Sequence, residues 1–210
     1  MGRVLLILAA ILPAAGPVIA REPQAMTLDT LLDGFRQMPG LEARFREEKR
    51  IAVLVVPLVS EGTLHFARPA RLVRHTLAPE RWSMLIDGPT LIFGDGNTRE
   101  EVDLEANPVV RDYVNSFLLI LVGDRVALVM GWRMEISVHA ESWEMTLQPM
   151  SEPIKKTIRE MTLRGKGAVI QWVKLVETTG DETVTLFSDI NPSRRYSQAE
   201  IDRTFRIPPG

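Results

Sequence analysis

Short stretches in which apolar and polar residues alternate recur along most of this sequence. Residues 41–46 and 132–138 are two of them, and in both an apolar residue stands at every second position. Because successive side chains of a strand point to opposite faces of a sheet, such stretches are typical of strands with one buried face. They follow one another closely, with turn pairs such as Asp87-Gly88 between them. Closely spaced strands without intervening helices predict an antiparallel meander.

Two other regions have apolar residues at helical spacing. Residues 27–37 begin with a threonine suited to cap a helix, and residues 107–123 begin with Asn-Pro and end with glycine. A short helix is expected next, over residues 124–131. The predicted order is a helix, several strands, two helices and several more strands. The last strand is expected at an edge, in the tail that begins at Ile201 and stops at Pro208-Pro209.

This order predicts an α+β fold with one large, strongly curved antiparallel sheet. Such a sheet and its few helices must bury their apolar faces against one another. Either the sheet closes on itself as a barrel, or the helices cover its concave face. A concave face that is not completely filled would form an apolar pocket.

The N-terminal twenty residues resemble a secretory signal peptide. Arg3 supplies the positive charge, an apolar run follows, and small residues precede an expected cleavage after Ala20. A transmembrane anchor is the alternative, but the run is short and contains Pro13 and Gly16. We therefore expect residues 1–20 to be removed on export and residues 21–210 to form a single domain.

Composition and motifs argue against several classes of function. The sequence has no cysteine and a formal net charge of −2, so disulfides, thiol catalysis and charge-driven nucleic-acid binding are not expected. Its three histidines lack the spacing of metal ligands, and no Gly-x-Ser-x-Gly motif is present. Adjacent acidic residues such as Glu47-Glu48 would point to opposite faces of a strand. We expect no enzyme activity, no metal and no cofactor.

Residues 51–59 form an apolar stretch interrupted by Pro57. One interpretation is a buried strand that ends at a turn, which we favour because short apolar runs usually belong to a core. The other interpretation is an apolar hairpin tip at the mouth of a pocket.

Arg68 has an unusual position for a charged residue. By the period of two it shares a strand face with Leu64 and Phe66. A buried guanidinium needs hydrogen-bond acceptors, because its desolvation is otherwise costly. Arg68 therefore either lies at a solvated strand end or donates to carbonyl groups of a covering helix.

The order of several motifs resembles that of LolA-like proteins, the periplasmic carriers of outer-membrane lipoproteins. The sharpest of these are GTLHFARPARL at residues 62–72, DGPTL at residues 87–91 and FRIPPG at residues 205–210. The resemblance covers nearly all of the chain after the predicted signal peptide. It implies a half-open β-barrel with a helical lid over an apolar cavity that takes acyl chains.

The resemblance also implies roles for particular residues. Arg68 matches the inward-pointing arginine that bonds the lid backbone, and residues 108–130 would supply part of the lid. Leu72 matches a position that helps to receive or hold substrate. We expect the lipid-binding cavity to be formed by Leu64, Phe66, Leu72, Leu85, Leu91, Phe93, Phe117, Leu118 and Leu121.

The implied function is a periplasmic carrier that acts as a monomer. It would take an acylated lipoprotein or another lipid from an inner-membrane donor complex to an outer-membrane acceptor. Aromatic residues common in the cavity wall of the family are replaced here by leucine and arginine, so the cargo could be another lipid. A lipid or lipoprotein sensor, an accessory protein of lipid or pigment assembly, and a lipid-acting enzyme remain alternatives.

Overall fold

The computed structural model describes residues 26–207. The predicted signal peptide and its cleavage site lie outside the described residues. Within this range the chain forms eleven strands, all joined to their neighbours in antiparallel pairs. They are β1 (Gly40–Arg50), β2 (Leu58–Ala67), β3 (Arg71–Ala78), β4 (Trp82–Asp87), β5 (Thr90–Gly94), β6 (Arg99–Asp103), β7 (Trp132–His139), β8 (Ser142–Pro149), β9 (Ile158–Lys166), β10 (Val169–Glu177) and β11 (Glu182–Asn191).

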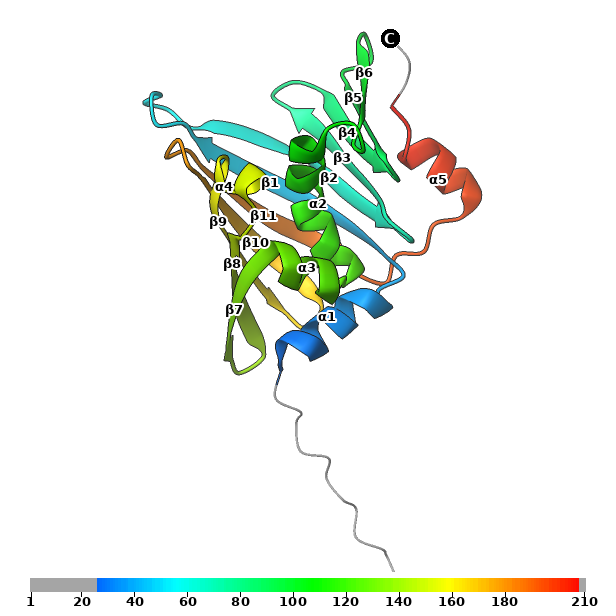
Figure 1. The fold of residues 1–210 in the computed structure, drawn as a ribbon. Helices are drawn as coiled ribbons and strands as arrows, with labels where there is room; N and C mark the ends of the chain where they lie inside the picture. The colour runs from blue at the N-terminus through cyan, green and yellow to red at the C-terminus, as the bar shows by residue number, and fades with distance from the viewer. Residues whose placement is uncertain (1–25, 208–210) are drawn as a thin grey trace, which may run out of the picture.

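These strands form one sheet in the order β6-β5-β4-β3-β2-β1-β11-β10-β9-β8-β7. Each half of the chain is a meander, and the two halves join where β1 pairs with β11. The sheet curves strongly, and the end strands β6 and β7 do not pair with each other (Figure 1). The predicted α+β fold with a curved, unclosed antiparallel sheet is confirmed.

The described part of the chain also forms five helices: α1 (Leu28–Gln37), α2 (Pro108–Val122), α3 (Arg125–Gly131), α4 (Glu152–Lys155) and α5 (Gln198–Thr204). The predicted cap is present at α1, where the Thr27 hydroxyl accepts from the Thr30 amide. Asn107 precedes α2 as expected, but its side chain makes no capping hydrogen bond. At α3 the Asp124 carboxylate accepts from the Ala127 amide. Helices α1, α2 and α3 lie over the concave face of the sheet (Figure 1). The sequence reasoning did not anticipate α4.

Helices α1 and α2 approach each other closely where α2 ends. Gly123 adopts a left-handed conformation with φ of 71°, and a Cβ there would lie 2.5 Å from the carbonyl oxygen of Leu32. Only glycine meets both requirements, because other residues carry a Cβ and rarely take this conformation. Gly123 thus allows the end of α2 to pack closely against the side of α1. Beneath them, Phe35 meets Trp143 edge to face, with 6.1 Å between ring centroids.

The predicted C-terminal edge strand is wrong, because residues 198–204 form helix α5. Ser197 and Glu200 make a capping box that starts the helix. Ile201 and Phe205, four residues apart, pack against the face of the sheet opposite to α1. The Ser-x-x-Glu pattern was a sequence signal for a helix, and it outweighs the apolar spacing that suggested a strand.

The favoured interpretation of residues 51–59 as a buried strand is also wrong. Strand β2 begins only at Leu58, and residues 51–57 form the loop between β1 and β2. The side chains of this loop are mostly exposed, with Val55 fully so. Residues 51–57 thus form an apolar hairpin tip, as in the second interpretation, whereas Leu58 and Val59 belong to β2.

Candidate functional site

A cavity of about 300 Å³ lies between α2 and the concave face of the sheet. Side chains from both halves of the sheet and from α2 surround it. They are Phe45, Glu47, Lys49, Leu64, Leu72, Arg74, Met84, Ile86, Tyr113, Val114, Ser116, Phe117, Ile158, Met161, Val173, Leu175, Thr183, Thr185 and Phe187.

Two aromatic rings close one side of the cavity. Phe117 of α2 stacks on Phe187 of β11, with 6.3 Å between centroids and 17° between ring planes. Beyond this pair, the space between α1 and the sheet is filled by side chains and retains a void of only about 10 Å³. The concave face is therefore packed under α1 and hollow under α2.

A partly buried ion pair forms a polar part of the cavity wall. Both guanidinium NH2 groups of Arg74 donate to the Glu47 carboxylate, at 2.8 and 2.9 Å, and the Thr185 hydroxyl donates to the same carboxylate at 2.8 Å. The guanidinium also lies over the Phe45 ring, 4.1 Å from its centroid. Burial favours the neutral acid, but hydrogen bonds and charge from Arg74, with Thr185 and Lys49, outweigh it and hold the Glu47 pKa below its ordinary value of 4.5.

A second ion pair lies further along β1. The Lys49 ammonium donates to the Glu177 carboxylate at 2.9 Å, and this hydrogen bond raises the pKa of Lys49. Tyr113 of α2 also lines this part of the cavity, and burial followed by the nearby Glu177 charge raises the pKa of its phenol. The cavity therefore combines an apolar wall with a polar end whose charges are paired, an arrangement that suits an amphiphilic ligand.

The structure places only some of the predicted cavity residues in its wall. Leu64, Leu72 and Phe117 line it. The other residues on the same side of the sheet lie elsewhere: Phe66, Leu91 and Leu118 are buried in the core, Leu121 packs beneath α1, and Phe93 contacts Trp82 at 6.0 Å between centroids.

The placement of Leu85 in the cavity is incorrect. Leu85 lies on the opposite face of the sheet, in the cluster that α5 covers. Its neighbours Met84 and Ile86 line the cavity instead. Since β4 is apolar at all three positions, its sequence does not show which face points inward.

Sequence reasoning missed the polar cavity residues. A signal for them was present, because Phe45, Glu47 and Lys49 follow one another at a period of two along β1. Arg74 likewise shares the inward face of β3 with Leu72. Once one residue of such a strand faces a cavity, its second neighbours do as well.

Arg68 occupies a position beside the lid helices. Its guanidinium donates to the carbonyl oxygens of Phe35 at 2.5 Å and Met38 at 2.9 Å, at the end of α1. It also donates to Leu121 and Val122 at the end of α2, over longer distances of 3.5 and 3.3 Å. The last carbonyls of a helix lack partners within the helix and carry partial negative charge. The Arg68 guanidinium therefore donates hydrogen bonds to, and offsets the charge of, two helix ends at once.

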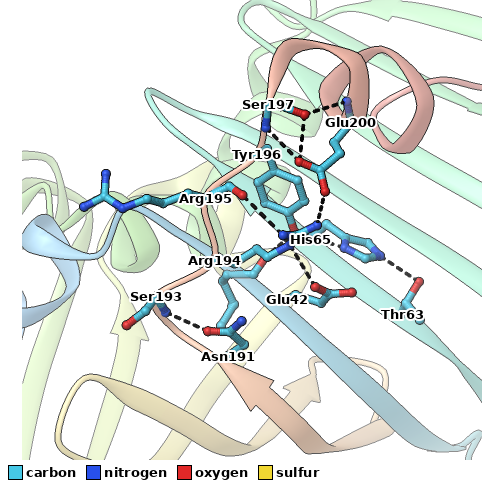
Figure 2. A network of polar contacts seen from close by, with 11 residues as sticks. Glu42, Thr63, His65, Asn191, Ser193, Arg194, Arg195, Tyr196, Ser197 and Glu200 are labelled. Atoms are coloured by element: carbon cyan, nitrogen blue, oxygen red, sulfur yellow. Dashed lines mark hydrogen bonds and ion pairs between the residues drawn. The ribbon is translucent and has the colours of Figure 1, made fainter.

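The opposite face of the sheet carries a polar network that fastens the segment before α5 (Figure 2). Arg194 forms ion pairs with Glu42 at 3.0 Å and with Glu200 at 2.6 Å. The Tyr196 hydroxyl donates to the Leu41 carbonyl at 2.9 Å and lies 3.1 Å from Nδ1 of His65. This network and the cavity lie on opposite faces of the sheet.

Acidification should loosen this fastening through His65. Burial, followed by the neighbouring His75 and the positive charge of Arg194, lowers the pKa of His65 below its ordinary 6.5, although Glu42 opposes the shift. The unfolded chain therefore binds this proton more readily than the folded one. The contribution of neutral His65 to the free energy of unfolding is fully present above pH 6.5 and is lost as the pH drops below that value. Urea titrations between pH 8 and pH 5 should show this fall, and it should be smaller in His65→Asn. Equal pH dependence in both proteins would refute the assignment.

Across residues 26–207, no cluster of three or more histidine, aspartate or glutamate side chains is arranged to hold a metal ion. Over the same range, no helix combines the length and apolarity needed to cross a membrane.

Helices α1, α2 and α3 thus cover the concave face of an unclosed sheet, and a cavity remains between α2 and the sheet. The chain belongs to the family described as outer membrane lipoprotein carrier protein LolA-like, whose model matches residues 20–200. The suspected family membership is thereby confirmed. No curated protein matches the sequence.

Solved structures with a similar fold are distant in sequence. A LolA superfamily protein from Nitrosomonas europaea is 9% identical with a TM-score of 0.45, over 87% of this chain and 99% of that one. MucB in the MucA/MucB complex of Pseudomonas aeruginosa is 12% identical with a TM-score of 0.51, over 83% of this chain and 58% of that one. At such identity the likeness concerns the fold alone.

Proposed function

We propose that this protein is a periplasmic carrier that encloses an acyl chain of a lipoprotein or a related lipid in the cavity under α2. It takes this cargo from a donor complex in the inner membrane and delivers it to an acceptor in the outer membrane, acting as a monomer and without catalysis. The observation that carries the proposal is the hollow itself, which is apolar on most of its wall and polar at one end.

The size and wall of the cavity favour a single chain. Ligand pockets have volumes of roughly 300–1,000 Å³, and this one, at about 300 Å³, lies at the lower limit. Each buried methylene contributes about 0.8 kcal/mol, so a sixteen-carbon chain offers on the order of 10 kcal/mol before ordering costs. The tail would contact residues such as Leu64, Ile86 and Val173, and the head group would lie near the Glu47–Arg74 pair.

Identification of bound lipid tests the proposal. The protein is expressed with its natural N-terminus, purified from the periplasm and extracted, and we expect mass spectrometry to find an acyl lipid in near-stoichiometric amount. Transfer of a fluorescent acyl lipid between two vesicle populations should then be faster with the protein than without it.

The same two measurements separate the alternatives. Bound lipid without transfer would favour a sensor or accessory protein, and chemical turnover of the lipid would favour an enzyme. Absence of any bound acyl compound, together with no uptake of a fluorescent fatty acid, would rule the carrier out.

A further inference from the structure

The loop between β1 and β2 exposes consecutive apolar side chains. We call residues 53–56 the apolar tip: Val53, Leu54, Val55 and Val56 are 88%, 49%, 100% and 71% exposed. Leu58, which follows Pro57, is also 53% exposed. This loop projects from the edge of the molecule, at the end of the sheet where the β10–β11 turn also lies (Figure 1).

The backbone beside the apolar tip is held in place by hydrogen bonds. The Leu54 amide donates to the Ile51 carbonyl at 2.9 Å, which closes a turn. The Ala52 amide donates to the Asp181 carboxylate at 2.9 Å, which fastens the loop to the β10–β11 turn. The structure thus presents these side chains to solvent on an ordered support, although burying them elsewhere would stabilise the chain.

The apolar tip follows directly after β1, a strand that lines the cavity. Glu47 and Lys49 of β1 line the polar end of the cavity, and the loop starts at Ile51, two residues further on. Along one strand the order is therefore an apolar wall, a polar end and an apolar tip. The last two parts match a bilayer surface, in which polar head groups lie next to an apolar interior.

The charges at the base of the loop are neutralised in pairs. Lys49 contacts Glu177 at 2.9 Å, and Arg50 contacts Glu48 at 2.9 Å. Binding through this region would therefore depend on apolar contact rather than on attraction to an anionic surface. A bilayer can surround a convex apolar projection without a matching groove, whereas a folded partner would need one.

We propose that the apolar tip inserts into the surface of a lipid bilayer and places the polar end of the cavity against it. This inference rests on the proposed carrier function, because a tail that passes directly between bilayer and cavity avoids exposure to water. Insertion itself, however, requires no cargo, so it can be measured independently of lipid uptake.

Vesicle flotation tests the insertion. The full chain is expressed, the exported form is identified by intact mass, and it is mixed with phosphatidylcholine vesicles, which carry no net charge. We expect the protein to float with the vesicles, with little effect of salt, and Val55→Glu to reduce the bound fraction about tenfold or more. Because Val55 is fully exposed, the substitution should leave folding and uptake of a soluble fatty-acid probe unchanged.

Two matched variants make the test specific. Val126→Glu makes the same change at a 69% exposed valine on α3, a helix that lies away from the β1–β2 loop (Figure 1), and should still float. Val173→Trp narrows the cavity and should also float while losing probe uptake, so failure of the carrier function and failure of insertion give different results. Insertion is refuted if the unmodified protein stays unbound, if Val55→Glu floats equally well, or if light scattering shows that the tip instead joins two copies of the chain.

Discussion

Replacing Val173 with tryptophan should weaken binding of an acyl probe about 100-fold. Val173 of β10 lines the cavity, where an indole would occupy space that the acyl chain needs. If the tail loses contact for about four methylenes, each contributing about 0.8 kcal/mol, the affinity falls by about 3 kcal/mol or roughly 100-fold. Titration of the protein with a fluorescent fatty acid measures this loss directly.

The next residue on the same strand provides the control. Lys174 faces the other side of the sheet, where it contacts Glu182 at 2.9 Å. Lys174→Trp therefore adds the same side chain to β10 outside the cavity and should bind the probe normally. If both variants bind equally well, the cavity under α2 is not where the acyl chain lies. Thermal unfolding of both variants shows whether reduced binding reflects lost folding.

The sheet was predictable because most of its strands have one buried face, which leaves a period of two in the sequence. The same rule fails where both neighbours are apolar, as around Leu85, because register with β3 then decides which side chain points inward. That register joins Leu72 to Ile86 and is set by the hairpin rather than by the residues of β4.

The polar end of the cavity illustrates a different limit. Glu47 and Arg74 lie on β1 and β3, which are separated in the sheet by β2. Each residue taken alone resembles an ordinary charged strand residue, and only the fold brings the two into a bidentate contact. The apolar tip was misjudged for a similar reason, since its exposure depends on whether any other element covers it.

Replacing Arg68 with leucine should lower the free energy of unfolding by about 2–4 kcal/mol, because hydrogen bonds from a charged group contribute about 1.5–3 kcal/mol each and water can replace only some of them. The two short contacts, to Phe35 and Met38, account for most of this effect. Urea denaturation measures it. Arg71→Leu is the control on the same hairpin, because Arg71 forms a half-exposed ion pair with Asp87 whose loss should cost less than about 1 kcal/mol.

Arg68→Leu also shows whether Arg68 controls opening of the helical lid or only stabilises the folded chain. If Arg68 holds α1 and α2 in a closed lid, its loss should speed both the exchange of a bound acyl probe and hydrogen exchange at the ends of these helices. Arg68→Lys keeps the charge but offers a single donor group, so its exchange rate should be intermediate. Reduced stability with unchanged probe exchange would assign Arg68 a purely structural role. Stability equal to that of Arg71→Leu would show that the carbonyls of Phe35 and Met38 find other donors.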